Sequence, residues 1–181
     1  MKIAIISPMI LPVPSLKGGA VEGLIESIIR ENEIRKKIEI DLISIYDKEA
    51  EKKSFDYKNS NFIFLDSNCI VREMDKFLNV LLKKVFRKRA INLDYVWKYY
   101  VTLKLRIIFE NNDYECVIIE NSSYLFNVFN SNKLKNKYRN KVLFHVHNKI
   151  NKKFFKWQKE LCSGVISISD YLHNNIQECI D

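Results

Sequence analysis

The sequence predicts an α/β domain with a mostly parallel sheet and helices on both faces. Six short runs rich in β-branched residues are separated, in nearly every case, by segments with helical periodicity. Strands that are apolar along their whole length are typical of a sheet covered on both sides. The chain has 181 residues, of which 47% are hydrophobic, and only four glycines and three prolines. It can therefore bury one core, and collagen-like or disordered chains are excluded.

The six apolar runs predict the strands in order. They cover residues 2–7, 38–46, 61–65, 115–120, 142–146 and 165–169. The first run, KIAIIS, ends at a proline, and the second, IEIDLISIY, alternates along the chain. The polar segment 47–60 between the second and third runs is expected to be a loop.

Helical periodicity fills much of the remaining chain. One stripe at i, i+3, i+4, i+7 and i+8 begins the first helix and consists of Val21, Leu24, Ile25, Ile28 and Ile29. Glu22 and Glu26 lie in its first turns, where carboxylates favour the helix dipole. Residues 74–86 form a strongly apolar helix face, and 96–108 repeat the spacing. Shorter helices are expected at 124–130, 152–161 and 170–180, the last capped by Ser169 or Asp170.

The net charge indicates which classes of partner to expect. Thirty Lys and Arg against 22 Asp and Glu give a net charge of +8, which favours an anionic partner such as a phosphorylated ligand or an acidic membrane surface. Nucleic acid is not expected, because the sequence has no RRM, KH, zinc-finger or helix-turn-helix signature.

The four cysteines form no CxxC pair, so neither a disulfide framework nor a metal site is expected. No run of about 20 uncharged apolar residues and no signal-peptide pattern is present, which predicts a cytoplasmic protein.

The loop after the first strand is the most informative segment. It reads SPMILPVPSLKGGA and places Gly18 and Gly19 at the start of the first helix, beside Lys17. Adjacent glycines let the backbone approach a ligand closely, and N–H groups at a helix N-terminus suit phosphate oxygens. The segment is neither GxGxxG nor a P-loop, which disfavours a dinucleotide or ATP site. A turn that only requires a glycine would explain the same letters.

Three segments together resemble family 4 glycosyltransferases of the GT-B fold, of the bacterial capsule, lipopolysaccharide or spore-coat type. They are the strand KIAIIS with its loop ending VPSLKGGAVE, the strand and turn VLFHVHN, and the segment GVISISDYL. The resemblance implies a Rossmann-like domain and a reaction that transfers a sugar, with retention, from a nucleotide-sugar to a glycan or lipid-linked acceptor in surface polysaccharide biosynthesis. It implies no cofactor and no essential metal.

Family members have two Rossmann-like domains, and the C-terminal one holds most of the donor contacts. Residues 1–181 correspond to the N-terminal, acceptor-side domain alone. This chain is therefore expected to be inactive without a C-terminal domain or a partner subunit. The alternative class is a non-catalytic half-domain that holds an acceptor or a partner protein.

The resemblance also assigns roles to single residues. Gly18 and Gly19 match the glycine pair that approaches the donor diphosphate, and His147 matches the histidine beside the donor sugar. His145 is expected to be a core or supporting residue on the same face of the strand. The alternative for His147 is a strand-end histidine whose ring is hydrogen-bonded to the backbone.

Polar residues at other strand ends complete the predicted site. Glu120 could accept a hydrogen bond from an acceptor hydroxyl or act as a base, and Asn121 follows it. A helix N-cap in the Ser122–Ser123 turn would explain the same letters. On the acceptor side, Asn148 and Lys149 are expected to make minor contacts.

The segment 83–89 carries a basic run directly after the apolar helix face. The run consists of Lys83, Lys84, Arg87, Lys88 and Arg89, with aromatic residues nearby. Basic residues attract anionic lipid, and aromatic side chains insert at the headgroup level. The run therefore predicts peripheral binding to the inner face of the membrane, although a solvated helix surface is the usual role of such a run.

Overall fold

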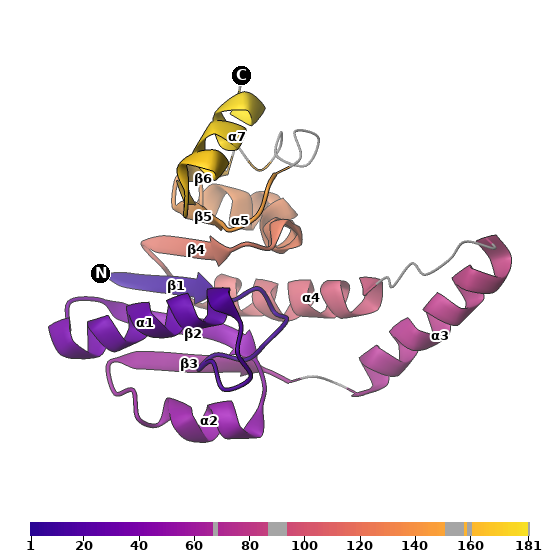
Figure 1. Ribbon diagram of the computed structural model, residues 1–181, viewed down its shortest axis with the longest axis horizontal. Coiled ribbons are helices and arrows are strands. Elements are labelled where there is room, and N and C mark those ends of the chain that lie inside the picture. Colours follow the sequence, from indigo (N-terminus) through magenta and orange to yellow (C-terminus); the bar gives the residue numbers. More distant parts are fainter. Residues whose placement is uncertain (67–68, 87–93, 151–157, 159–160, 181) are drawn as a thin grey trace.

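The computed structural model describes residues 1–66, 69–86, 94–150, 158 and 161–180. Six strands form one sheet in the order β3-β2-β1-β4-β5-β6, and every neighbouring pair is parallel (Figure 1). Helices flank this sheet, so the predicted α/β class with a Rossmann-like parallel sheet is confirmed.

The elements of the described chain have the following bounds. The strands are β1 Lys2–Ile6, β2 Glu39–Ile45, β3 Ser60–Leu65, β4 Cys116–Glu120, β5 Val142–Val146 and β6 Cys162–Ser167. The helices are α1 Ala20–Arg35, α2 Lys48–Ser54, α3 Cys69–Phe86, α4 Tyr95–Asn111, α5 Asn132–Lys137 and α7 Asp170–Ile180, with a 3₁₀ helix η1 at Ser123–Asn130. Ser169 Oγ accepts the backbone N–H of Leu172 at 3.3 Å, so Ser169 caps α7.

Alternate residues of β1 face two different cores. Ile3 and Ile5 pack with Ile25 and Ile29 of α1, whereas Ala4 and Ile6 belong to a larger core on the other face. That larger core includes Val101, Leu105 and Phe109 of α4 together with buried residues of η1 and α5. Burial on both faces explains why the central strands read as continuous apolar runs in the sequence.

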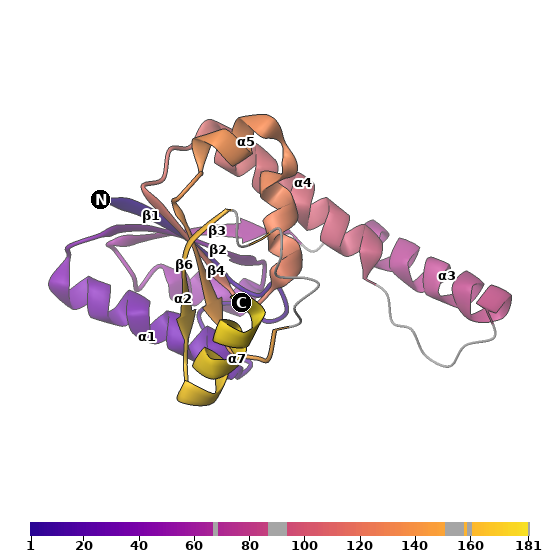
Figure 2. The same cartoon turned by 90° about the horizontal axis from the view of Figure 1, so that it is seen from above.

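The strand order creates a switch point between β1 and β4. From β1 the chain continues outward to β2 and β3, and it then crosses to β4, β5 and β6 on the other side of β1 (Figures 1 and 2). Loops that leave the carboxyl ends of β1 and β4 therefore run in opposite directions and leave a crevice between them. In open α/β sheets ligands bind in this crevice.

Several predicted elements differ from the structure. The expected loop 47–60 contains the helix α2, and α5 was not expected; each is short and polar, with few buried residues to reveal a period. The last strand begins at Cys162 and ends at Ser167, earlier than the predicted 165–169. The long helix begins at Cys69 rather than at residue 74. The expected helix at 152–161 lies outside the described residues, apart from Gln158 and Leu161.

Within the described residues, none of the helices has the length and apolar character that a membrane span requires.

Candidate functional site

The loop after β1 folds back against the sheet and α1. The backbone N–H of Val13 donates to Ser44 Oγ at 3.0 Å, and that of Ser15 donates to Glu26 Oε2 at 2.8 Å. Glu26 also accepts hydrogen bonds from Lys53 and Tyr57, so one buried carboxylate ties the loop to α1 and α2. The loop is consequently held in one place before the glycine pair begins.

The two glycines of this loop have different surroundings. Both have a positive φ, +79° at Gly18 and +100° at Gly19, which L side chains rarely adopt. A Cβ on Gly18 would meet nothing within 4 Å, whereas one on Gly19 would lie 2.2 Å from Glu22 Oε2. The positive φ therefore favours glycine at both positions. At Gly19 a side chain would also have to displace the end of the Glu22 side chain and Leu11, whereas Gly18 has open space around it.

Lys17 is held at the rim of the loop. Its ammonium group forms an ion pair with the carboxylate of Asp47, the residue that caps α2. This ion pair lowers the pKa of Asp47. Lys17 is itself exposed, so an incoming anion would compete with Asp47 for it.

A carboxylate and two imidazoles meet at the carboxyl ends of β4 and β5. Glu120 is fully buried, and its Oε2 lies 3.0 Å from His145 Nδ1 and 3.0 Å from His147 Nε2. The two imidazole rings lie 4.3 Å apart between centroids, which confirms that both point to the same face of the strand. Because a carboxylate only accepts hydrogen bonds, this contact favours the His147 tautomer with hydrogen on Nε2.

The turn after β4 reinforces this cluster. Asn121 has a φ of +53°, which turns its side chain so that Oδ1 accepts the backbone N–H of His147 at 3.1 Å. Ser122 Oγ donates to the carbonyl of Pro8 at 3.1 Å and links the two loops across the switch point. The alternative of an N-cap in this turn is wrong for Ser122, whose side chain makes no cap hydrogen bond. The His147 ring likewise bonds a carboxylate rather than the backbone.

Glu22 is a functional candidate that the sequence analysis assigned only to the helix dipole. It is buried in the first turn of α1, and burial raises the pKa of its carboxyl group. The charge of Glu120 raises this pKa further, while His147 and the backbone N–H groups of Glu22 and Leu11 lower it. Glu22 is therefore close to Gly19 and within electrostatic range of Glu120 and His147. The sequence carries no signal of this position, because the approach of Glu22 to Gly19 depends on the fold of the loop.

A cavity of about 730 Å³ lies beside the cluster, between the switch-point loops and helices α3 and α4. Pro8, Asn121, Trp97 and Tyr124 contribute to its wall. This volume is in the range of small-molecule sites. Of the predicted site residues that the structure describes, Asn121 lines this cavity, whereas Gly18, Gly19, Glu120 and His147 do not. Asn148 and Lys149 are exposed just beyond β5 and do not line it either.

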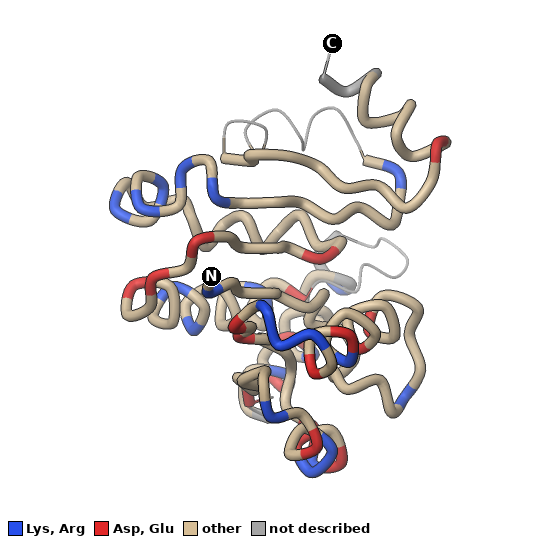
Figure 3. Tube along the Cα trace, turned by 90° about the vertical axis from the view of Figure 1, so that its left-hand side faces the viewer, with Lys and Arg blue, Asp and Glu red and all other residues tan. Residues whose placement is uncertain are grey.

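The predicted basic run is only partly described. Lys84 is exposed near the end of α3. Lys83 belongs to the same helix, but its side chain lies outside the described residues, as do Arg87, Lys88 and Arg89. A second basic segment, 133–141, has five Lys and Arg in nine residues and leads into β5, at the amino edge of the sheet (Figure 3). Part of the positive charge therefore lies at the edge opposite the cluster.

Among the described residues, one group of side chains is close enough to hold a metal ion. Donor atoms of Glu120, His145 and His147 all lie within 4.8 Å of one another. In the structure the same atoms hydrogen-bond with each other.

Cys116 and Cys162 are half-buried free thiols far apart in the sequence. Burial raises the pKa of both thiols, that of Cys162 to about 12.

Strand order and switch-point loops define the class of this chain as a Rossmann-like α/β domain. A scan against protein-family models gives no match. No curated protein is similar enough to the chain to be counted as a relative. The class is thus defined by the sheet, and the function is inferred from the site.

Proposed function

We propose that this chain is the acceptor-side domain of a retaining glycosyltransferase that uses a nucleotide-activated sugar. The observation that supports the proposal is the Glu120–His147 contact at the carboxyl ends of β4 and β5, where Ser122 Oγ also donates to Pro8 in the loop that leads to Gly18 and Gly19. The resemblance to family 4 glycosyltransferases supports it, because two of the three matching segments contain Gly18, Gly19 and His147. Transfer to a glycan or lipid-linked acceptor at the inner face of the membrane, in surface polysaccharide biosynthesis, is part of the proposal.

The proposed reaction exchanges one bond at the anomeric carbon for another on the same face of the sugar. The bond between this carbon and the diphosphate oxygen breaks, and a bond to the acceptor oxygen forms. The leaving diphosphate takes the acceptor proton, so atoms and charge balance with no metal ion or cofactor. A second domain or subunit supplies most contacts to the nucleotide.

The residues of this chain have separate roles in the proposed reaction. Glu120 is fully buried behind two imidazoles, so it positions His147 rather than touching the acceptor. His147, with Nε2 directed at Glu120, has Nδ1 for a hydrogen bond with a sugar hydroxyl. Gly18 lets the diphosphate approach the backbone, and Lys17 would exchange Asp47 for a phosphate oxygen.

The acceptor would bind in the cavity beside Asn121. Trp97 and Tyr124 offer aromatic surface there, and the backbone and side chains of the turn after β4 offer polar groups. Asn148 and Lys149 lie at the exposed end of β5, where they could contact either substrate in the two-domain protein.

The test uses the protein translated from the complete reading frame that contains these residues. It is incubated with a panel of nucleotide-sugars and lipid-linked or glycan acceptors, and transfer is measured. Replacing His147→Ala should lower kcat by about 100-fold or more, with little change in the acceptor KM, because the lost hydrogen bond acts in the transition state. The matched control is His173→Ala, since His173 is exposed on α7.

Two results would contradict the proposal. A turnover of His147→Ala close to that of the unmodified protein would remove this residue from the site. No transfer by the complete protein with any donor would favour the binding half-domain instead. A chelator should leave turnover unchanged; a loss restored by a divalent cation would reassign Glu120, His145 and His147 as metal ligands.

A further inference from the structure

Strand geometry brings three potential metal ligands together at the carboxyl edge of the sheet. His145 lies on β5 and His147 directly after it, and their rings lie on one face of the sheet, 4.3 Å apart between centroids. Glu120, the last residue of β4, is the partner of His145 in the register of the two strands. We call these three side chains the Glu–His cluster.

The donor atoms of the Glu–His cluster are spaced almost as a zinc ion requires. Glu120 Oε2 lies 3.0 Å from His145 Nδ1 and 3.0 Å from His147 Nε2, and all three donor groups lie within 4.8 Å of one another. In a tetrahedral zinc site the donors are about 3.3 Å apart, because each lies about 2.1 Å from the ion. Small side-chain rotations would therefore admit an ion between them.

Backbone hydrogen bonds that an ion would leave intact hold the frame of this cluster. Asn121 Oδ1 accepts the backbone N–H of His147 at 3.1 Å, and the backbone N–H of Asn121 donates to the carbonyl of His145 at 2.8 Å. Supporting contacts of this kind orient metal ligands and raise the affinity of a site. The cluster is therefore prepared by the fold and does not have to be assembled by the ion.

Two buried carboxylates elsewhere in the chain each pair with a lysine. Asp41 lies 3.2 Å from Lys2 Nζ, and Glu26 lies 2.8 Å from Lys53 Nζ. Such a cation offsets the cost of removing a carboxylate from water. Within the described residues, Glu120 forms ion pairs only with the two imidazoles, which are charged only when protonated. A bound metal ion would supply the permanent positive charge that this carboxylate lacks.

Glu22 adds a second buried carboxylate near the cluster. It lies within electrostatic range of Glu120 and His147, so a divalent cation among the three ligands would be attracted by both carboxylates. The side chains of His145 and His147 are 10% and 9% exposed, which gives an ion access from solvent.

We propose that the Glu–His cluster binds a zinc ion, with Glu120, His145 and His147 as ligands and water in the fourth position. Two imidazole nitrogens and one carboxylate oxygen suit Zn²⁺, whereas Mg²⁺ and Ca²⁺ prefer oxygen ligands. Because a ligand nitrogen carries no hydrogen, His147 Nε2 cannot bind zinc and donate to Glu120 at the same time. Zinc therefore inhibits the proposed transfer; this effect rests on the proposed function, but zinc binding does not.

The test measures Zn²⁺ binding to the 181-residue chain by competition with a chromophoric chelator. The chain should bind one Zn²⁺ at this site, and Co²⁺ in its place should give the visible absorption of a tetrahedral site. His145→Ala and His147→Ala should each weaken Zn²⁺ binding by more than about 100-fold, because loss of a supporting contact alone costs about 10–100-fold. His173→Ala is the matched control, since His173 is exposed on α7, and its affinity should equal that of the unmodified chain.

Two results would overturn the zinc site: no Zn²⁺ bound by the unmodified chain, or equal affinities of the unmodified chain and both cluster variants, with circular dichroism confirming that the variants are folded. In the complete protein, Zn²⁺ should lower turnover and a chelator should restore it; turnover unaffected by Zn²⁺ would overturn the inhibition. A complete protein that binds Zn²⁺ but transfers no sugar would contradict the proposed function and leave the zinc site standing.

Discussion

Two buried carboxylates of the same sheet, Asp41 and Glu120, have very different partners. Asp41, on β2 near the amino edge, accepts from Tyr114 Oη at 2.8 Å and from Asn61 Nδ2 at 3.1 Å, and it pairs with Lys2 Nζ at 3.2 Å. Glu120, at the carboxyl end of β4, contacts two imidazoles. Both carboxylates are almost completely removed from water.

Two of the hydrogen-bond donors around Asp41 have raised pKa values. Burial and the contact with Asp41 raise the pKa of the Tyr114 hydroxyl, and the same carboxylate raises the pKa of Lys2. Both donors therefore keep their hydrogens at any physiological pH, and the Asp41 cluster is a fixed structural element. The Asp41 cluster therefore stabilises the amino edge, whereas the Glu120 cluster lies at the carboxyl edge, where the proposed reaction takes place.

The first prediction exchanges each carboxylate for its amide. Glu120→Gln in the complete protein should lower turnover about 100-fold, because an amide no longer selects one tautomer of His147. Its free energy of unfolding should fall by only about 1 kcal/mol, since a neutral imidazole can pair with either end of an amide. Transfer kinetics and chemical denaturation measure the two effects.

Asp41→Asn should show the reverse pattern. Three donors converge on Asp41, and an amide would place an N–H among them, so the free energy of unfolding should fall by about 3 kcal/mol. Turnover per folded molecule should stay close to that of the unmodified protein. Equal losses of stability and of turnover in both variants would contradict the division of roles between the two edges.

The second prediction adds a third carboxylate, Glu26, which holds the loop before the glycines. Burial alone would raise the pKa of Glu26, but hydrogen bonds from Lys53, Tyr57, Arg30 and the Ser15 backbone lower it to about 2. A carboxyl group whose pKa is lower in the folded state stabilises the fold above its unfolded pKa, near 4.5, and loses this contribution as pH falls toward about 2. Because Arg30 and Lys53 are partly exposed and screened, the contribution is about 2 kcal/mol.

Denaturation between pH 6 and pH 2 measures this effect. The difference in unfolding free energy between the unmodified chain and Glu26→Gln should be largest above pH 4.5 and shrink as pH falls toward about 2. Lys53→Met should reduce the same difference. A constant difference at all pH values would show that Glu26 acts by packing and not by its charge.

The sequence predicted the sheet well because burial on both faces leaves a direct signal. KIAIIS and VLFHV are apolar at nearly every position, so the strands and their parallel arrangement follow. Helix α2 gave no such signal, because Ala50 and Ser54 are its only buried residues; the capping contact of Asp47 with the Glu49 and Ala50 N–H groups specifies it instead.

The candidate site was predictable only in part. Carboxyl ends of neighbouring parallel strands meet at one edge, which predicts that residues near 120 and 147 lie close together. The sequence does not reveal which way Glu120 points, because the last residue of a strand can face the ligand or the interior. It also does not reveal Glu22, whose contact with Gly19 depends on the fold of the whole loop.

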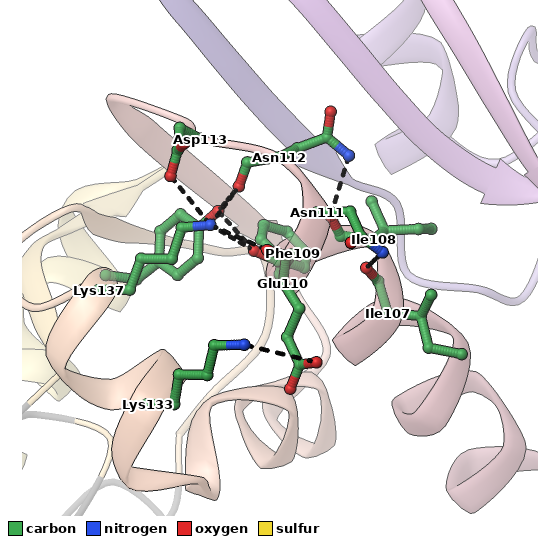
Figure 4. A network of polar contacts seen from close by, with 10 residues as sticks. Ile107, Ile108, Phe109, Glu110, Asn111, Asn112, Asp113, Lys133 and Lys137 are labelled. Carbon is green, nitrogen blue, oxygen red and sulfur yellow. Dashed lines mark hydrogen bonds and ion pairs between the residues drawn. The ribbon is translucent and has the colours of Figure 1, made fainter.

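The last and smallest prediction concerns Lys137, near the amino edge of the sheet. Asp41 is an anion that accepts hydrogen bonds there, whereas Lys137 is a cation that donates them. The Lys137 ammonium group contacts three carbonyl oxygens at the end of α4, those of Asn112 at 2.8 Å, Phe109 at 3.0 Å and Glu110 at 3.4 Å (Figure 4). These carbonyls have no partner inside the helix, and a cation there also favours the helix dipole. Lys137→Met should therefore lower the free energy of unfolding by about 1 kcal/mol, as measured by chemical denaturation.

Lys133→Met is the matched control in the same short helix. Lys133 Nζ lies 3.9 Å from Glu110 Oε2, and its side chain is 70% exposed. A long contact between solvated groups contributes almost nothing, so this variant should unfold within about 0.3 kcal/mol of the unmodified chain. Equal stabilities of the two variants would show that Tyr138 Oη, which donates to the carbonyls of Phe109 and Asn112, suffices at the end of α4 once Lys137 is removed. The amino edge would then depend on the Asp41 cluster rather than on both.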